Sequence, residues 1–170
     1  LIGNETFNAG LEVGRRSTRD FTLTIPNTTA HRRYYLGMIL DANNTIAESD
    51  ENNNVVEIEI NIVRPRVVIG EAKRGTIAAS GQRDEYEFTV TGGPKTVMVR
   101  LSGFDTYLYL KDSNGRTIAE DGDSGGNGGS LIQKVLSDGT YIIQAMGYNN
   151  KTGNYTLSLS EVTIDLVAES

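Results

Sequence analysis

Residues 84–90 read DEYEFTV, and this short stretch decides the fold class of the chain. Its apolar residues alternate with polar ones, so that Tyr86, Phe88 and Val90 share one face. A period of two is the pattern of a β-strand that packs one face on a core and turns the other face to water. The stretch is therefore predicted to lie in a sheet with one buried side, with its glutamates on the solvent side.

The same alternation recurs before and after this stretch. Turns rich in Gly and Asn, such as DSNGR (112–116) and NKTG (150–153), separate the runs and supply residues that tolerate a positive φ. We found no helical periodicity, so the chain is predicted to be all-β and to form β-sandwiches. The other alternating runs are DFTLTIP (20–26), VVEIEINIV (55–63), TVMVRLSG (96–103), DTYLYLKD (105–112), YIIQAMGY (141–148) and NYTLSLS (154–160).

Composition excludes several classes of protein. The 170 residues include 16 basic and 22 acidic side chains, for a net charge of −6, and the basic residues are scattered. A nucleic-acid-binding protein would instead show a basic patch, so no nucleic-acid partner is expected. The chain has no cysteine and therefore no disulfide or thiolate metal site. No apolar run approaches the length of a membrane span, and the first residues lack the features of a signal peptide.

A domain boundary is predicted near residue 66, within NIVRPRVVIG (61–70). Pro65 cannot donate to a β-ladder, and an arginine flanks it on each side. Residues 67–160 are long enough for a complete sandwich, whereas residues 1–66 fall short of the roughly 100 residues that an immunoglobulin-like sandwich needs. The first unit is therefore expected to be small for an independent sandwich.

Residues 67–160 resemble the bacterial pre-peptidase C-terminal (PPC) domain. The matching segments are GTIAASGQRDEYEFTV (75–90), DTYLYLKDSNGRTIAE (105–120), LSDGTYIIQAMGY (136–148) and GNYTLSL (153–159). The resemblance implies a jelly-roll-type β-sandwich. Such domains occur beside the catalytic domains of secreted peptidases or within surface proteins, and the collagen-binding domains of collagenases are similar to them.

Residues 34–54, YYLGMILDANNTIAESDENNN, resemble the end of a CARDB domain, the immunoglobulin-like "cell adhesion related" module of bacteria and archaea. Family members have further strands ahead of a segment like LIG (1–3), so the resemblance implies an incomplete Ig-like sandwich over 1–66. Missing strands would leave a sheet edge open and Val56 and Ile58 poorly covered. The strands could come from a longer parent protein or from a neighbour, or the reduced sandwich could pack on the second domain.

The tail SEVTIDLVAES (160–170) continues the alternation through Val162, Ile164 and Leu166, and residues 161–170 are predicted to form an extra C-terminal strand. One interpretation is a donor strand that adds to the sheet of a neighbouring copy. The interpretation we favour is an ordinary last strand or the start of a following module, because strand addition needs an open edge.

Residues 122–126 read GDSGG, the sequence that surrounds the nucleophile in trypsin-like proteases. A nucleophilic Ser124 would need a histidine base within hydrogen-bond reach, and His31 is the only histidine in the chain. His31 is predicted to lie in a turn of the first unit and Ser124 in a Gly-rich loop of the second. The motif is therefore interpreted as a coincidental match, and no enzymatic activity is expected.

Calcium ligands and glycosylation sites are further candidates. In collagenase-type relatives, Ca²⁺ is held by residues of the linker and by aspartates that enter the DxYxF strand. That resemblance makes Asp84 and Glu71 candidate calcium ligands, although Lys73 and Arg74 oppose a cation near the linker. Glycosylation sequons of the form Asn-x-Thr provide the other kind of site. They start at Asn4, Asn27, Asn43, Asn150 and Asn154.

Tyrosines provide a candidate binding face. Tyr107 and Tyr109 share one face of their strand, Leu108 and Leu110 share the other, and Tyr148 follows a later strand. In collagenase relatives, tyrosines on one sheet contact the ligand. We nevertheless expect Tyr107 and Tyr109 to pack in the core with their hydroxyls at its edge, as buried tyrosines often do.

The sequence as a whole favours a pair of non-catalytic extracellular modules that belong to a larger secreted or cell-surface protein and have an adhesive or targeting role. Expected partners are neighbouring domains, copies of the chain, an extracellular matrix protein or a glycan. The alternative is a structural subunit of an extracellular filament or surface layer, assembled by β-strand exchange. A peptidase fragment is a third interpretation, supported by the GDSGG motif and by the catalytic domains beside which PPC domains occur.

Overall fold

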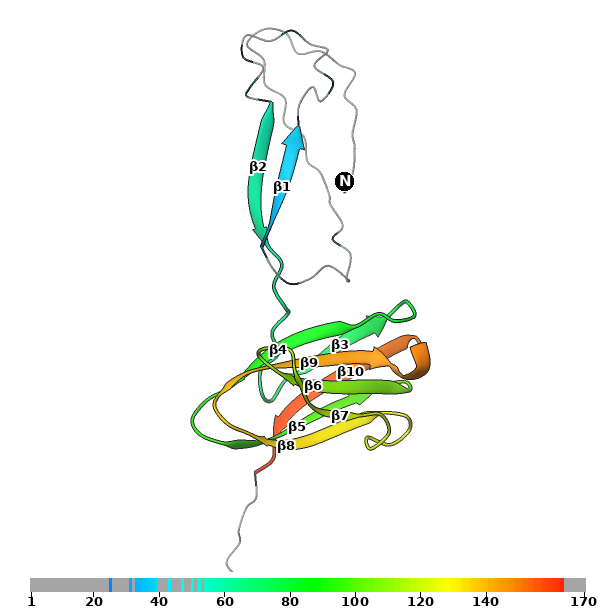
Figure 1. Ribbon diagram of the computed structural model, residues 1–170. Helices are drawn as coiled ribbons and strands as arrows, with labels where there is room; N and C mark the ends of the chain where they lie inside the picture. Colours follow the sequence, from blue (N-terminus) through cyan, green and yellow to red (C-terminus); the bar gives the residue numbers. More distant parts are fainter. Residues whose placement is uncertain are drawn as a thin grey trace, which may run out of the picture.

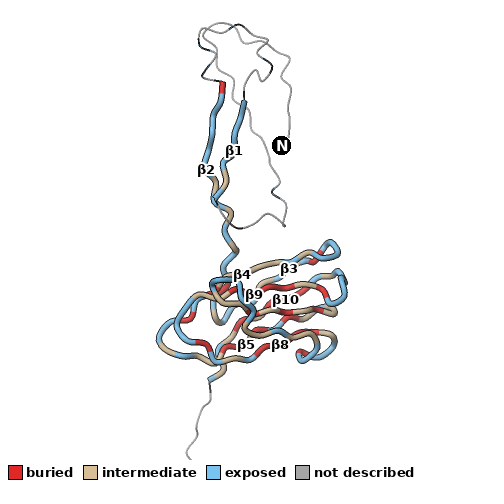
Figure 2. The backbone as a smooth tube through the Cα atoms, in the orientation of Figure 1, coloured by how far each residue is buried: buried red, intermediate tan, exposed pale blue. Residues whose placement is uncertain are grey.

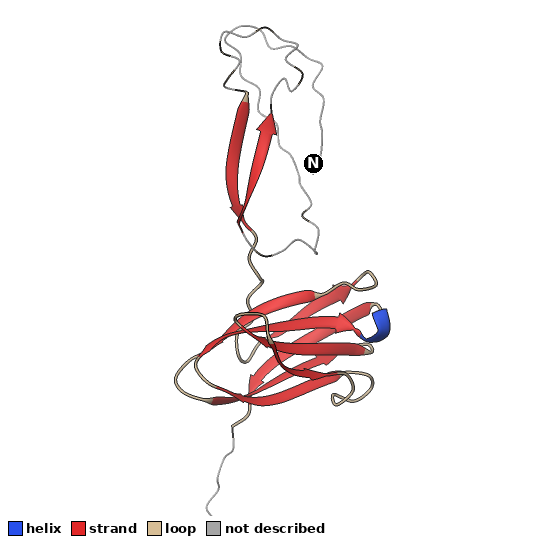
Figure 3. Cartoon of the chain, in the orientation of Figure 1, coloured by secondary structure: helices blue, strands red, loops and turns tan. Residues whose placement is uncertain are grey.

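The computed structural model describes residues 25, 31, 33–39, 43, 47, 50, 52 and 54–163. These residues form β-strands, connecting loops and one short 3₁₀ turn, η1 (Tyr148–Asn150), which confirms the all-β prediction (Figures 1 and 3). Within this part of the chain, no helix has the length and apolar character needed to cross a membrane.

The first unit contributes one antiparallel strand pair to the described structure. Strand β1 (Arg33–Ile39) pairs with β2 (Val55–Asn61). Val56 and Ile58 are 45% and 58% exposed, in agreement with the expectation that these side chains are poorly covered. The predicted strand at 20–26 lies, apart from Ile25, outside the described residues, so the rest of the expected Ig-like sandwich is not described here.

The second unit is a sandwich of two four-stranded antiparallel sheets, as predicted (Figure 1). One sheet has the order β3-β10-β5-β8 and the other the order β4-β9-β6-β7. The strands of the first sheet are β3 (Ala72–Ile77), β10 (Gly153–Glu161), β5 (Lys95–Ser102) and β8 (Ser130–Leu136). Those of the second are β4 (Asp84–Val90), β9 (Gly139–Gly147), β6 (Thr106–Asp112) and β7 (Thr117–Asp121).

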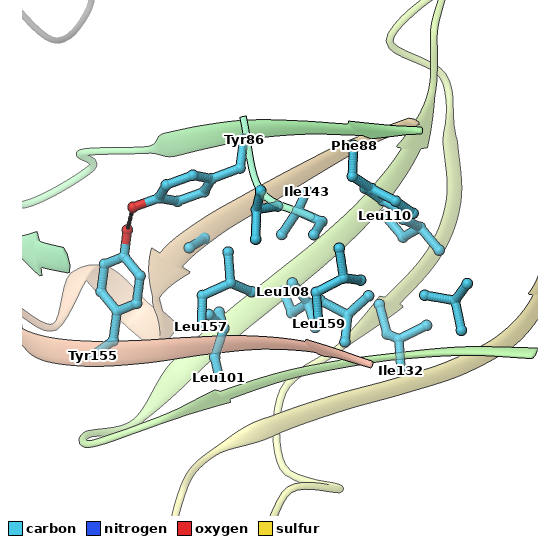
Figure 4. Close-up of a cluster of buried hydrophobic side chains, with 14 of the residues drawn as sticks. Tyr86, Phe88, Leu101, Leu108, Leu110, Ile132, Ile143, Tyr155, Leu157 and Leu159 are labelled. Atoms are coloured by element: carbon cyan, nitrogen blue, oxygen red, sulfur yellow. Dashed lines mark hydrogen bonds between the residues drawn. The ribbon is translucent and has the colours of Figure 1, made fainter. Parts of the chain in front are cut away.

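The core lies between these two sheets, where the inward side chains of alternate strand positions meet (Figures 2 and 4). Leu108 and Leu110 of β6 face Leu157 and Leu159 of β10, and all four are almost completely buried. Burial of aliphatic side chains of this kind is the main favourable term in folding. The alternation in the sequence therefore corresponds directly to the two faces of each sheet.

The linker between the units is tied to β4. The backbone N–H of Glu87 donates to the carbonyl of Pro65, and the N–H of Val67 donates to the carbonyl of Glu87, at 2.9 and 3.0 Å. Val67 itself is 2% exposed and belongs to the core of the sandwich. The linker thus covers part of the free edge of β4, which an unpaired strand would leave open. The domain boundary near residue 66 stays a prediction.

The end of β10 includes the first residue of the predicted extra strand. Glu161 pairs with Val97 of β5, and the N–H of Val162 then donates to the carbonyl of Thr96. The described chain ends at Thr163. Most of the segment predicted as a donor strand therefore lies outside the described residues, and its role stays a prediction.

Candidate binding face

The Gly-Asp-Ser-Gly-Gly loop is held by a carboxylate and does not face a histidine. Asp121 accepts hydrogen bonds from the Ser124 hydroxyl at 2.6 Å and from the Ser124 backbone N–H at 3.1 Å. His31 instead lies with its Nδ1 3.5 Å from the Glu85 carboxylate. The two residues of the hypothetical catalytic pair thus contact different carboxylates, and within the described part of the chain Ser124 and His31 do not form the hydrogen bond that a triad requires.

Close backbone packing explains two glycines of this loop, Gly125 and Gly129. A Cβ on Gly125 would lie 2.7 Å from the backbone of Gly129, and a Cβ on Gly129 would lie 2.6 Å from the Leu101 carbonyl oxygen. Any larger residue would therefore force the loop away from β5. The last glycine of the motif, Gly126, has nothing within 4 Å but has a φ of +74°, a conformation that favours glycine. Packing at Gly125 and backbone conformation at Gly126 thus account for the paired glycines of the motif.

Tyr107 and Tyr109 lie on the outer face of β6, and the expectation that they pack in the core was wrong. Leu108 and Leu110 take the inward positions and are 0% and 1% exposed. The alternation of β6 would allow either the tyrosines or the leucines to face the core. The leucines carry no polar atom, so burying them costs less than burying phenol groups that need hydrogen-bond partners. The strand consequently turns its tyrosines outward.

Three tyrosines gather on this outer surface. The ring of Tyr107 lies 5.0 Å from that of Tyr109 and is stacked on that of Tyr148 at 6.0 Å, with an interplanar angle of 15°. Lys111 places its ammonium 5.7 Å from the centre of the Tyr109 ring. Gly122 packs against Tyr107, where a Cβ would be 3.3 Å from the ring. We call Tyr107, Tyr109, Lys111 and Tyr148 the tyrosine face.

The surroundings of the tyrosine face affect the phenol of Tyr107. Burial and the nearby Glu120 carboxylate raise the pKa of Tyr107 above its ordinary value. In the neighbouring strand β9, Gln144 pairs with Tyr109 in the sheet register and donates to Glu85 at 2.8 Å. The Tyr107 hydroxyl therefore stays protonated and can donate a hydrogen bond, and the nearby Gln144 side chain is held in place by Glu85.

Sequence reasoning missed the ion pairs that tie the linker to the sandwich. Arg64 donates to Glu85 at 2.7 Å, and Arg66 lies 3.5 Å from Glu87. Burial raises the pKa of the Glu85 carboxyl, but its contacts with Arg64 and Gln144 outweigh burial and hold the pKa below its usual value. The sequence did contain a signal for these ion pairs, because Arg64 and Arg66 have the same spacing of two residues as Glu85 and Glu87.

The two candidate calcium ligands have protein partners in this structure. Asp84 accepts hydrogen bonds from the Tyr155 hydroxyl at 2.7 Å and from Gln82 at 2.8 Å. Glu71 accepts from the Val68 backbone N–H and lies 3.6 Å from the Lys73 ammonium. Among the described residues, no group of three or more acidic or histidine side chains could hold a metal ion. Calcium binding at Asp84 and Glu71 stays a prediction.

Three of the five sequons fall on described residues. Asn43, Asn150 and Asn154 are exposed, and the Asn154 side-chain oxygen accepts a hydrogen bond from Thr76 at 2.8 Å. Asn4 and Asn27 lie outside the described residues. Exposure is a requirement for glycan attachment but does not establish it, so glycosylation stays a prediction.

Comparison with known proteins finds one family model and several similar solved structures. Residues 3–58 match the CARDB family. Similar solved structures include the pre-peptidase C-terminal domain of a Bacillus anthracis collagenase, at 20% identity over 58% of this chain and 95% of that one, with a TM-score of 0.49. None of the curated proteins compared with the chain matches it.

Two further similar structures are PliG proteins, periplasmic inhibitors of g-type lysozyme. The Aeromonas hydrophila protein is 13% identical over 59% of this chain and 100% of its own, with a TM-score of 0.42. The Salmonella Typhimurium protein is 20% identical over 58% of this chain and 99% of its own, with a TM-score of 0.41.

Proposed function

We propose that the chain is a non-catalytic extracellular module with an adhesive or targeting role, part of a larger secreted or cell-surface protein, and that it binds an extended polypeptide through the tyrosine face. The observation that carries the proposal is the outward position of Tyr107, Tyr109 and Tyr148, while leucines fill the core. The Tyr107 ring is stacked on that of Tyr148 and tilted against that of Tyr109. Tyrosine is enriched at protein interfaces because its ring supplies contact area and its hydroxyl a hydrogen bond.

An extended polypeptide suits the chemistry of this face. The tyrosine rings offer apolar area for side chains such as proline, while Lys111 and the exposed Glu120 supply polar groups for peptide N–H and C=O groups. A matrix protein meets this description, and the exposed sequons support an extracellular location. The separate carboxylate contacts of Ser124 and His31 support a role without catalysis.

The proposal is tested by binding of the chain to immobilised collagen and gelatin, with cellulose as a glycan surface. Tyr148 is 41% exposed, so Tyr148→Ala removes a ring of the face without opening the core. We expect about tenfold weaker binding, as for a central interface tyrosine. Tyr35→Ala, in β1, is the matched control because Tyr35 is exposed and lies outside the face. Equal losses in both variants, or binding to cellulose alone, would overturn the proposal.

A second proposal is a structural subunit of a filament or surface layer assembled by β-strand exchange. It is supported by the alternation in the sequence after Thr163 and by β7 and β8, which end their sheets. Electron microscopy and light scattering of the full chain and of a chain without residues 164–170 separate the two functions. Filaments that disappear on truncation support strand exchange. If the full and the truncated chain are both monomeric, the result supports the binding module.

A further inference from the structure

The two outer faces of the sandwich differ in charge, although the chain is acidic overall. The outer face of β4-β9-β6-β7 carries Glu85, Glu87 and Glu120. On β3-β10-β5-β8, the outward positions alternate with buried residues, and none of those between 72 and 160 is Asp or Glu. Hydroxyl groups occupy many of them instead. These are Thr76, Thr96, Ser102, Thr156, Ser158 and Ser160.

This hydroxyl-rich face contains an open depression. Its volume is about 520 Å³, and its lining includes Arg74, Ser102 and Thr156. In the sheet register, Thr156 of β10 lies between Arg74 of β3 and Ser102 of β5, so the three form a row across the strands. The row ends beside Arg100, which pairs with the next outward residue of β10, Ser158.

The two arginines of this face are available for a ligand. Within residues 54–163, no hydrogen bond or ion pair engages the exposed Arg74 side chain, and Arg100 uses one nitrogen to donate to the Gly125 carbonyl at 2.6 Å. Among the other described arginines, Arg33, Arg64, Arg66 and Arg116 each lie beside a carboxylate, and Arg83, in the loop before β4, is exposed without such a partner. Unpaired cations on an otherwise acidic chain indicate an anionic partner.

We propose that the face of β3-β10-β5 around Arg74 and Arg100 binds an acidic polysaccharide. A guanidinium group matches a carboxylate with two parallel hydrogen bonds, so each arginine can hold one uronate group. Each Ser or Thr hydroxyl both donates and accepts, as sugar hydroxyls do, so the row at Ser102 and Thr156 pairs with the rest of the sugar. This site is separate from the tyrosine face, which lies on the other sheet.

The depression also borders Asn154, the first residue of a sequon. A glycan on Asn154 would cover the depression, so attachment there and polysaccharide binding exclude each other. The test therefore uses the full chain from a bacterial host that does not glycosylate. Titration with polygalacturonate is compared with neutral dextran and with polyglutamate, which carries carboxylates but no sugar hydroxyls.

We expect polygalacturonate to bind more tightly than either comparator, and about 150 mM salt to weaken binding by screening. Arg74→Gln and Arg100→Gln should each lower the affinity about tenfold, since each removes a charge-assisted hydrogen-bonded pair. Arg74→Lys keeps the charge but loses the forked geometry, so it should fall between wild type and Arg74→Gln. Thr156→Val keeps the shape, removes one hydroxyl and should weaken binding about threefold.

Arg116→Gln is the control, because it removes the same charge from an exposed turn of the other sheet. Thermal unfolding checks that each variant is folded, and Thr156→Val tests the site even if an arginine variant fails that check. Binding of polygalacturonate no tighter than dextran overturns the proposal. So does an equal loss in Arg116→Gln. Equal binding of polyglutamate overturns it in favour of an acidic peptide.

Discussion

Gly75 lies directly beneath the ring of Tyr155, its partner across the β3-β10 pair. A Cβ on Gly75 would be 2.3 Å from Cζ of that ring, far inside van der Waals contact. The ring has little room to move because its hydroxyl is hydrogen-bonded to that of Tyr86 across the core (Figure 4) and also donates to the Asp84 carboxylate. Position 75 therefore requires glycine, since the Tyr155 ring occupies the space that a side chain would need.

Gly75→Ala should lower the free energy of unfolding by about 1–3 kcal/mol, the usual cost of overpacking. Urea denaturation measures the change. Gly37→Ala, on β1, is the control, since a Cβ there meets nothing within 4 Å. A loss in Gly75→Ala no larger than that in Gly37→Ala would show that the Tyr155 ring yields freely.

The hydroxyl of Tyr155 gives a second prediction. Burial, together with its hydrogen bonds to Tyr86 and Asp84, raises the pKa of Tyr155 far above its ordinary value. Tyr155→Phe leaves those two groups without this partner and should cost about 1–3 kcal/mol of stability. Ultraviolet titration of the folded wild type should show Tyr155 among the late-ionising tyrosines, together with Tyr86, whose pKa burial also raises. The number of late-ionising tyrosines should fall by one in Tyr155→Phe and stay unchanged in Tyr35→Phe.

At the scale of the elements, the sequence predicted strands well wherever one set of alternating residues was polar. In β4 the glutamates marked the solvent face, and Tyr86, Phe88 and Val90 are buried as expected. In β6 both sets are large and largely apolar, so the period alone could not say whether Tyr107 or Leu108 faces inward. The tie between linker and β4 joins residues about 20 positions apart, and local patterns carry no information on such pairs.

The contact between the linker and β4 should make stability depend on pH. Arg64 and Gln144 hold the Glu85 carboxylate and lower its pKa despite burial. A carboxyl whose pKa is lower in the folded state stabilises that state above its unfolded pKa, and the contribution is lost as pH falls through the folded pKa. The stability difference between wild type and Glu85→Gln should therefore be larger at pH 7 than below about pH 4.

Urea denaturation at both pH values measures that difference, with Glu57→Gln on the exposed face of β2 as the control. A difference between wild type and Glu85→Gln that stays constant with pH would mean that Glu85 acts through packing and not through its charge.

At the scale of the whole molecule, the linker decides how the two units are joined. Arg66 has a side chain that is 83% exposed, yet its backbone runs along β4 and the next residue, Val67, is buried in the core. Proteases cleave backbone that can leave its hydrogen bonds, so side-chain exposure alone does not predict a cut. The bond after Arg66 should therefore resist trypsin in the native protein, and the sandwich should begin at the linker's paired residues.

Val67→Ser removes the buried side chain that anchors the linker and should speed cleavage after Arg66 by about tenfold or more, given the usual value of burying a valine. Val68→Ser is the control, because Val68 is adjacent but exposed. Mass spectrometry of the early products locates the cut. Rapid cleavage after Arg66 in the wild type would mean that the linker leaves β4 readily, and the two units would then act as independently tethered domains. Slow cleavage that only Val67→Ser accelerates would mean that residues 65–67 belong to the sandwich itself.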